Sequence, residues 1–178
     1  VHSAVTRQCG DLPIFFAGDS TGIDPVLHLA SREGSLAGRN AATYPEMEPE
    51  PRPVSLEIAF CEPQMAVVGT SSAGVPAEEL VVGEATFEDQ GRAVVLGRNV
   101  GRVRVFVNRS RGTLEGAEIL GPEAEHLAHL LAWAIQSGTS VKDLLRLPFY
   151  HPTLEEILRS ALENAAHEAG WRQHHDQA

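Results

Sequence analysis

The chain has 178 residues, of which 43% are hydrophobic and 21% are charged, a composition typical of a globular protein rather than a disordered one. Its net charge of −10 argues against binding to nucleic acid or to an anionic membrane surface, because both reward clustered lysine and arginine. No run of about 18 apolar residues is present to form a membrane-spanning helix, and the first residues lack the apolar core of a signal peptide.

The two cysteines, Cys9 and Cys61, lie far apart and form no CxxC or CxxxxC motif. This spacing excludes a dithiol redox centre within the chain and argues against a metal held by cysteines. We expect two buried or half-buried free thiols in a cytoplasmic protein, because the cytoplasm keeps thiols reduced. The chain begins at Val1 without a methionine, and we expect it to be part of a longer protein.

The first predicted element is a short buried strand over residues 13 to 19 that ends in the turn Gly18-Asp19. A helix is expected from about Pro25 to Ala42, since proline suits the first helical turn. A carboxylate at the end of a strand and beside a helix amino terminus can bind sugar hydroxyls, and the helix N–H groups can meet an anionic oxygen. Close packing of the helix on the strand explains the small residues of this helix without any ligand, and periodicity alone favours that interpretation.

Four prolines and several charges follow between residues 44 and 53, which is the composition of a linker. We place the linker at residues 47–53, between a first segment, residues 1–46, and a main domain, residues 54–170. The last residues, 171–178, are polar and are expected to form a flexible tail.

The main domain begins with short apolar runs separated by turn residues, which predict strands over residues 54–60, 64–70, 81–89, 93–96, 103–108 and 114–120. Close turns between consecutive strands indicate an antiparallel sheet with one face buried. Apolar periodicity and helix-breaking residues then predict helices over residues 122–137, 140–147 and 153–168. Strands first and helices last give an α+β domain, an antiparallel β-sheet with helices packed on it.

His126 and His129 lie three residues apart on the first of these helices, a spacing that could hold a metal ion. No third ligand is evident nearby in the sequence, and the pair His174-His175 falls in the polar tail. We therefore predict no metal site.

A histidine stands just before the last helix, in the phrase Tyr-His-Pro-Thr-Leu-Glu-Glu of residues 150–156. A histidine beside a fixed carboxylate is the commonest general acid–base pair near neutral pH. Ordinary helix capping gives the same pattern, because Thr153 and Glu156 have the spacing of a capping box and acidic residues favour the helix dipole. Residue chemistry alone favours capping over catalysis.

Separate phrases resemble those of the pyridine nucleotide–disulfide oxidoreductases. Residues 14–19, Ile-Phe-Phe-Ala-Gly-Asp, followed by Leu-His-Leu-Ala at 27–30 and Glu-Gly at 33–34, resemble the second flavin-binding motif of that family. Residues 150–156 resemble its His-Pro-Thr-x-x-Glu signature and are most similar to the dihydrolipoamide dehydrogenases. Residues 116–122 resemble the strand-to-helix phrase of the family's dimerisation domain. The resemblance covers nearly the whole chain, in the family's order.

The resemblance implies that residues 1–46 are the end of a FAD-binding domain, with its last strand, turn and helix. The main domain would then be a dimerisation domain. In the first segment, the resemblance implies that Gly18 and Asp19 bind FAD, with the Asp19 carboxylate on the ribityl chain. Leu27 and His28 would then lie near the isoalloxazine ring.

For the histidine phrase, the resemblance implies that His151 is the acid–base and that Glu156, rather than Glu155, orients it. In that family the histidine reaches into the active site of the partner subunit, so a homodimer is implied as well. The proton chemistry is reasonable, because dithiols attack disulfides as thiolates and a histidine near neutral pH can take the proton.

The function implied is that of a FAD-dependent NAD(P)H:disulfide oxidoreductase in redox homeostasis, with FAD as cofactor, NAD(P)H as co-substrate and a small disulfide such as lipoamide as substrate. The chain departs from the family in lacking the Gly-x-Gly-x-x-Gly motif and the redox-active cysteine pair. We therefore expect it neither to catalyse a reaction nor to bind FAD tightly alone. Two alternatives remain: a non-catalytic dimerisation or binding module of the same fold, and a family member acting on glutathione or another small disulfide.

Overall fold

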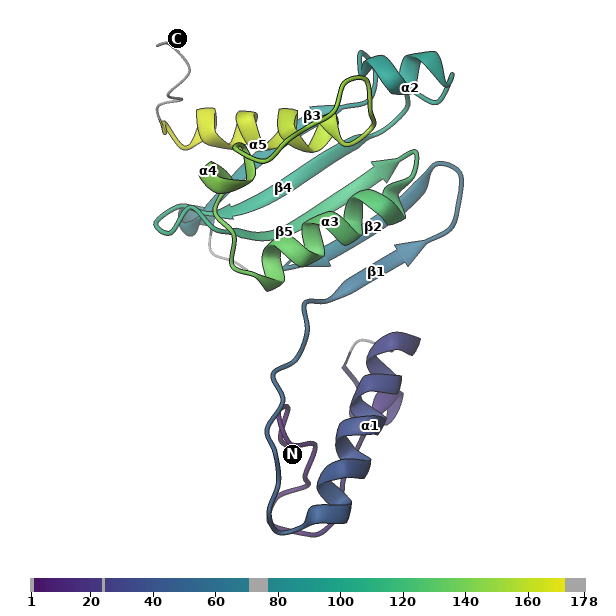
Figure 1. Ribbon diagram of the computed structural model, residues 1–178, viewed down its shortest axis with the longest axis vertical. Coiled ribbons are helices and arrows are strands. Elements are labelled where there is room, and N and C mark those ends of the chain that lie inside the picture. The colour runs from purple at the N-terminus through teal and green to yellow at the C-terminus, as the bar shows by residue number, and fades with distance from the viewer. Residues whose placement is uncertain (1, 24, 71–76, 172–178) are drawn as a thin grey trace. The chain divides into compact units, whose positions relative to one another are not determined.

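The computed structural model describes residues 2–23, 25–70 and 77–171 (Figure 1). The chain divides into two compact units, Val1–Pro53 and Val54–Ala178, which we call the N-terminal unit and the C-terminal unit. No helix among the described residues is long and apolar enough to cross a membrane.

The N-terminal unit is built on one long helix, α1, which runs from Leu27 to Thr43. It begins two residues later than predicted, because the backbone of Val26 is still extended and forms the N-cap. The buried face of α1 follows the helical repeat, yet it includes polar residues: its members are Leu29, Glu33, Leu36, Ala37 and Asn40.

The regular strand predicted over residues 13–19 is wrong, although the turn and the helix that follow it are present. Phe15 forms a single isolated bridge with Gln8, and Gly18–Thr21 form a short 3-10 helix, η1. A strand is stabilised by a ladder of hydrogen bonds with a neighbouring strand, and the described part of this unit contains no such ladder. Ile14 is accordingly about half exposed rather than buried.

The proline-rich residues 47–53 lie in the N-terminal unit and are fastened to it by polar contacts. The Asn40 side chain accepts the backbone N–H of Glu48 at 3.0 Å and donates to its carbonyl oxygen at 3.1 Å. Glu50 donates its backbone N–H to the carbonyl oxygen of Val5 at 2.8 Å. This segment therefore completes the N-terminal unit against α1.

The C-terminal unit contains a five-stranded antiparallel sheet, in the order β1-β2-β5-β4-β3 within the described residues. The strands are β1 Leu56–Ala59, β2 Gln64–Gly69, β3 Leu80–Thr86, β4 Arg102–Asn108 and β5 Leu114–Gly121. The central pairing sets Val105 of β4 opposite Ala117 of β5, and both residues are fully buried. The predicted antiparallel sheet is confirmed.

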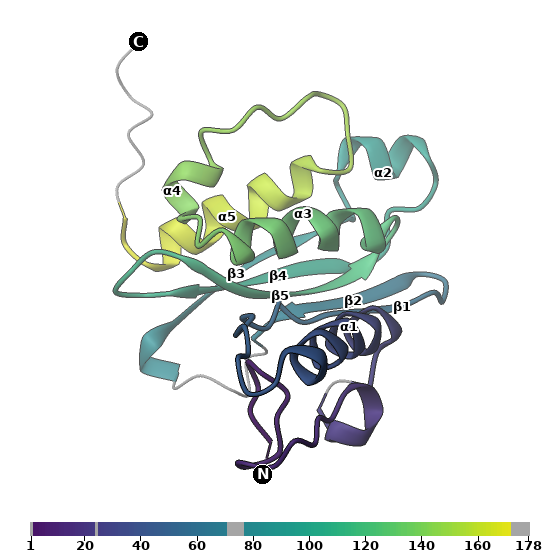
Figure 2. The same ribbon diagram turned by 60° about the horizontal axis from the view of Figure 1, so that its bottom comes forward.

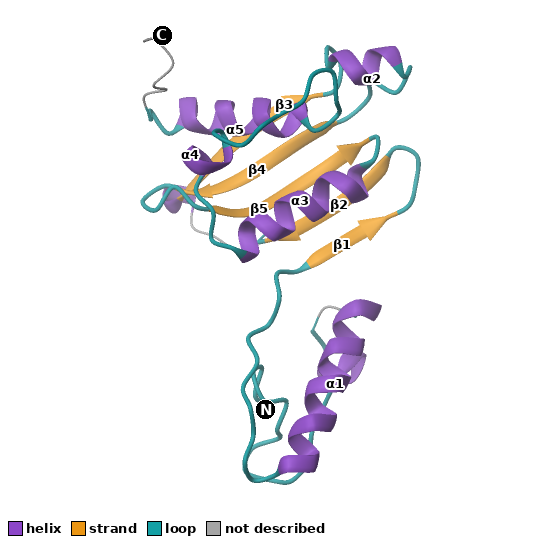
Figure 3. Ribbon diagram, in the orientation of Figure 1, coloured by secondary structure: helices purple, strands orange, loops and turns teal. Residues whose placement is uncertain are grey.

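Helices cover one face of this sheet: α3 Ala124–Gln136, the short α4 Val141–Leu144 and α5 Glu156–Glu168. Helix α3 packs on β2 and β5, whereas α5 packs on β3 and β4, so the two lie side by side over the sheet (Figure 2). Figure 3 shows the same arrangement by element type, with the strands preceding these helices along the chain. The predicted α+β class is confirmed.

Residues 93–96, predicted as a strand, instead belong largely to a short helix, α2, from Gly91 to Val95. Gln90 caps this helix, because its side-chain oxygen accepts the backbone N–H of Ala93 at 2.7 Å. Ala93 is buried, whereas Val94 and Val95 are both exposed. Two adjacent exposed residues do not fit the alternation of a half-buried strand, so the local cap prevails over the strand propensity of valine.

The packing of α5 on the sheet depends on Gly83 in β3. A Cβ atom at this position would meet the carbonyl oxygen of Ala161 and lie 2.6 Å from Ala165 Cβ, both on α5. The helix backbone therefore approaches β3 directly over the glycine, and this approach fixes the height of α5 above the sheet.

We predict that Gly83→Ala lowers the free energy of unfolding by about 1–3 kcal/mol, the usual cost of overpacking a core. Gly91→Ala is the matched control, since nothing lies within 4 Å of its added methyl group and alanine suits a helix better than glycine. Urea unfolding followed by tryptophan fluorescence measures both variants. Equal stability of Gly83→Ala and the unchanged chain would contradict the close approach of α5.

Candidate functional site

The histidine of the sequence motif lies in the loop between α4 and α5. His151 Nδ1 is 2.9 Å from Oε1 and 3.1 Å from Oε2 of Glu156, the first residue of α5. The histidine side chain is 79% exposed and that of Glu156 is 29% exposed. The structure therefore brings together the two residues that the sequence motif singled out, at the open surface of the C-terminal unit.

The Glu156 carboxylate also serves the backbone at the start of α5. Its Oε2 atom accepts the N–H of Thr153 at 3.0 Å, which is the glutamate half of the predicted capping box. The other half is not formed among the described residues, since α5 has no side-chain cap hydrogen bond, and the Thr153 hydroxyl donates to the carbonyl oxygen of Tyr150 at 2.8 Å. One carboxylate thus caps the loop and holds the imidazole, so the capping and acid–base interpretations are compatible.

The electrostatics of this pair follow from its contacts. The backbone N–H of Thr153, and after it His151, lower the pKa of Glu156, so this carboxylate is ionised at neutral pH. An ionised carboxylate requires a proton on His151 Nδ1, which leaves Nε2 as the nitrogen that can take or give a proton. No described residue hydrogen-bonds Nε2. The carboxylate therefore orients the imidazole through Nδ1, a geometry that is suitable for acid–base chemistry.

The other predicted site residues lie in the N-terminal unit. Gly18 starts η1 with a φ of +65°, and Asp19 follows it with an exposed carboxylate that has no partner among the described residues. Leu27, the first residue of α1, is 87% exposed, and His28 beside it is exposed as well. Val26 provides no side-chain cap for α1. The turn, the free carboxylate and the uncapped helix start are thus present, while their role in binding FAD stays a prediction.

One charged cluster of this unit was not predicted from the sequence. Glu33 and Arg7 are both buried and form an ion pair of 2.9 Å. The available signal was the helical spacing, because Glu33 stands four residues from Leu29 and from Ala37 on the apolar face of α1. Its partner is remote in sequence, so the pattern alone does not identify it.

The two histidines considered for a metal make different contacts. His129 Nδ1 contacts the carbonyl oxygen of Glu125 at 2.6 Å, whereas His126 lies near the carboxylates of Glu123 and Glu125. Glu123 is itself paired with a guanidinium group, that of Arg98, at 2.7 Å. His174 and His175 fall outside the described residues.

The predicted burial of the cysteines is wrong for one of them. Cys9 is half-buried, but Cys61 is exposed. Cys61 lies in the loop that joins β1 to β2, where its sulfur is 3.1 Å from the carbonyl oxygen of Pro63. A hairpin loop faces solvent, so an apolar residue type does not ensure burial there.

An apolar groove of about 620 Å³ lies beside the histidine loop. It is lined by side chains of α3, of the loop and of α5, among them Leu130, Trp133, Leu147, Phe149, Tyr150 and Leu158. Trp133 and Tyr150 are among the most exposed large side chains of the described residues. A concave apolar surface with exposed aromatic residues is typical of a protein–protein interface.

The α+β fold of this chain is also found in solved structures of disulfide reductases. LpdA from Mycobacterium tuberculosis has a TM-score of 0.72 at 24% identity, covering 84% of this chain and 33% of that one. The HOCl-induced flavoprotein disulfide reductase RclA from Escherichia coli has a TM-score of 0.72 at 17% identity, covering 84% of this chain and 35% of that one. At these identities the likeness shows the fold.

Sequence comparison gives the family. Residues 56–162 match the model of the pyridine nucleotide-disulphide oxidoreductase dimerisation domain. The dihydrolipoyl dehydrogenase of Haloferax volcanii is 36% identical over 162 residues, 88% of this chain and 33% of that protein. That of Bacillus subtilis is 32% identical over 164 residues, 89% of this chain and 34% of that protein. The chain therefore belongs to the pyridine nucleotide-disulphide oxidoreductase family, and it spans about a third of the length of these curated relatives.

We predict that His151→Ala raises the pKa of Glu156 toward its ordinary value but leaves it below that value, because the larger influence, the Thr153 N–H, remains. An NMR titration of the side-chain carboxyl measures this change. His126→Ala, which removes an exposed histidine from α3, is the control and should leave the titration of Glu156 unchanged.

A complete return of the Glu156 pKa to its ordinary value in His151→Ala would contradict the capping role of the carboxylate. The lowered pKa also sets the pH range of stabilisation. The contribution is fully present above the usual glutamate pKa of about 4.3 and is lost as the pH falls through the lower, folded-state value.

Proposed function

We propose that this chain is part of a FAD-dependent NAD(P)H:disulfide oxidoreductase similar to dihydrolipoyl dehydrogenase. In this proposal it supplies the homodimer interface and the acid–base pair His151–Glu156 to the active site of the partner subunit. The observation that supports it is the oriented imidazole, held at Nδ1 by Glu156 and exposed at Nε2. The two cysteines of this chain do not have the spacing of a redox pair. The proposal therefore takes the reacting sulfurs from another part of the longer protein and from the substrate.

The chemistry assigned to His151 is a proton transfer. A thiol of the dithiol substrate gives its proton to Nε2, and the resulting thiolate attacks a sulfur of the enzyme's disulfide. A sulfur–sulfur bond forms, the original one breaks, and the displaced sulfur leaves as a thiolate. Glu156 stabilises the imidazolium that forms, because its carboxylate stays ionised beside Nδ1. The reverse sequence reduces a disulfide substrate such as lipoamide, or alternatively glutathione.

The residues of the N-terminal unit fit a flavin. The free, exposed carboxylate of Asp19 is a suitable acceptor for ribityl hydroxyls, and the exposed Leu27 offers an apolar surface to a ring. Gly18 and His28 complete the assigned flavin-binding residues. FAD, when bound, supplies the two-electron exchange with NAD(P)H. We assign this activity to redox homeostasis in the cytoplasm.

The homodimer assignment rests on the apolar groove and on the exposure of the histidine. Trp133 and Tyr150, which line the groove, offer large apolar side chains that a second copy of the chain can cover. His151 follows Tyr150 directly, so covering the groove would also bring the histidine to the neighbouring subunit. This arrangement makes dimerisation a requirement for catalysis.

In the longer protein, we predict that Glu156→Gln lowers the rate of dithiol oxidation by about 10²- to 10⁴-fold, the usual contribution of acid–base catalysis. Glu155→Gln is the matched control, since among the described residues the neighbouring carboxylate forms no hydrogen bond with His151. Steady-state turnover of dihydrolipoamide with NAD⁺ measures both variants. Equal losses in the two variants would contradict the pairing of His151 with Glu156.

We also predict that His151 acts across the dimer interface. Homodimers of His151→Ala, and homodimers in which the redox cysteines are replaced by serine, should both be inactive. Co-expression of the two chains should restore up to half of the unchanged activity, because one site of the heterodimer then has both the cysteines and the histidine. Heterodimers purified with two different tags provide the measurement. No recovered activity would contradict a shared site, and an active His151→Ala homodimer would contradict the acid–base role of His151.

A further inference from the structure

We infer that Glu33 is a positioning residue for the flavin site, because its buried carboxylate fixes the Gly18–Asp19 turn. This inference rests on the proposed function, since it concerns the same turn and the same cofactor. It assigns a role to the buried pair of Arg7 and Glu33, whose carboxylate accepts a backbone N–H of the turn.

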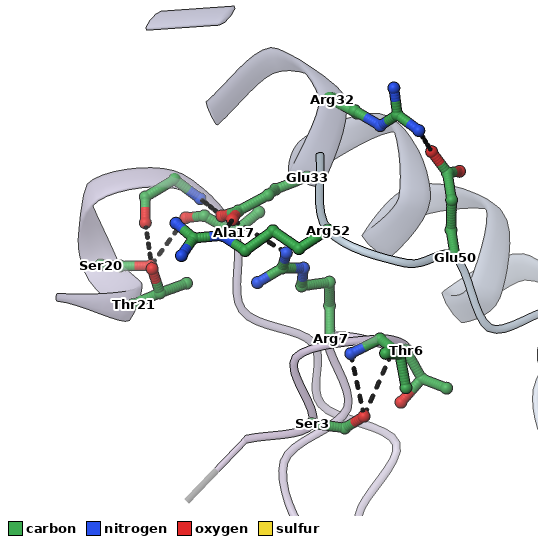
Figure 4. Close-up of polar contacts among 12 residues, drawn as sticks. Ser3, Thr6, Arg7, Ala17, Ser20, Thr21, Arg32, Glu33, Glu50 and Arg52 are labelled. Atoms are coloured by element: carbon green, nitrogen blue, oxygen red, sulfur yellow. Dashed lines mark hydrogen bonds and ion pairs between the residues drawn. The ribbon is translucent and has the colours of Figure 1, made fainter. Parts of the chain in front are cut away.

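The contacts of Glu33 are shown in Figure 4. Its side chain is 4% exposed, and Oε2 accepts the backbone N–H of Gly18 at 2.9 Å. Oε1 lies 2.9 Å from Arg7 Nη2 and 3.9 Å from Arg52 Nε. The carboxylate therefore uses one oxygen for the turn and the other for the guanidinium groups that compensate its charge.

A buried ion pair is weak evidence for stability, because apolar residues of similar volume often stabilise a protein as well or better. The pair is better explained by the geometry it imposes. Gly18 has a φ of +65°, and a Cβ atom there would lie 3.1 Å from Ala30 Cβ on α1. The glycine backbone is thus pressed against α1 while Glu33, one turn further along, accepts its N–H.

Arg7 holds the same segment from the other side. Its own backbone has a φ of 66°, its N–H donates to the carbonyl oxygen of Ser3 at 2.9 Å, and its carbonyl oxygen accepts the N–H of Phe16 at 3.0 Å. The guanidinium and the carbonyl of one residue therefore fix Glu33 and the chain just before Gly18. The two contacts leave little freedom to the backbone that enters the turn.

The turn beyond Gly18 is closed by its own hydrogen bonds. The Thr21 hydroxyl donates to the carbonyl oxygen of Gly18 at 2.8 Å, and the N–H of Gly22 donates to that of Asp19 at 3.1 Å. The backbone of Asp19 is therefore fixed on both sides, while its carboxylate is exposed and unpaired among the described residues. A fixed backbone with a free side chain is a preorganised acceptor, which binds at a smaller entropic cost.

The test uses the longer protein, stripped of FAD and titrated with it. We expect Glu33→Leu to raise the dissociation constant for FAD at least tenfold, because the Gly18 N–H loses its acceptor. Glu33→Gln should lower the affinity for FAD less than Glu33→Leu does, since the amide oxygen can still accept that N–H. Glu50→Gln is the matched control: it also removes a carboxylate paired with arginines, but one that does not contact the turn, so its affinity should be unchanged.

A double variant separates positioning from folding. Arg7→Met combined with Glu33→Leu replaces the buried ion pair by apolar side chains, which should restore much of the stability that either single change costs. We expect its affinity for FAD to stay low, and amide hydrogen exchange at Gly18 to be faster than in the unchanged protein. Native affinity in a stable double variant would overturn the inference while leaving the proposed function intact. Failure of the unchanged protein to bind FAD would overturn both.

Discussion

The hydrogen bonds of the Glu156 carboxylate are the interaction on which the candidate site depends. This group accepts the N–H of Thr153 and contacts Nδ1 of His151 at the same time, so the loop cap and the proposed acid–base pair share one side chain. The position of Glu156 is in turn set by α5, whose first residue it is. Helix α5 is seated on β3 through its contact with Gly83. The close approach at Gly83 thereby supports the helix whose first residue holds the imidazole of His151.

The parts of the fold that could be predicted are those in which the periodicity of neighbouring residues determines the secondary structure. Val103, Val105 and Val107 recur at every second residue and are fully buried, and this period of two fixes β4 and its buried face, although Phe106 between them is buried as well. The pattern fails where valine residues, which favour strands, are not buried. Val94 and Val95 are exposed on a short helix that a preceding glutamine caps. It fails also near Phe15, because a strand requires a partner and the sequence of one segment does not say whether a partner is present.

The candidate site was predictable to the extent that its residues are close in sequence. The spacing from His151 to Glu156 predicts the pair, although its position on the helix makes Glu155 equally eligible. The structure shows that Glu156 is the residue that contacts the imidazole. Glu33 could be recognised as a polar residue on an apolar helix face, but not as the acceptor of Gly18. That contact joins elements separated by a loop, and its geometry depends on how the loop folds.

The two carboxylates use the same pair of contacts for different purposes. Each accepts a backbone N–H from the turn that it supports, and each has a cationic or basic partner. The partner of Glu33 is Arg7, which is buried. An arginine does not give up its proton in proteins, so this ion pair can fix the local backbone geometry but cannot transfer a proton. The partner of Glu156 is His151, which is exposed and whose imidazole is a group that can take or give a proton. The identity and exposure of the partner thus separate the carboxylate that we propose to position the turn from the one that we propose to serve acid–base chemistry.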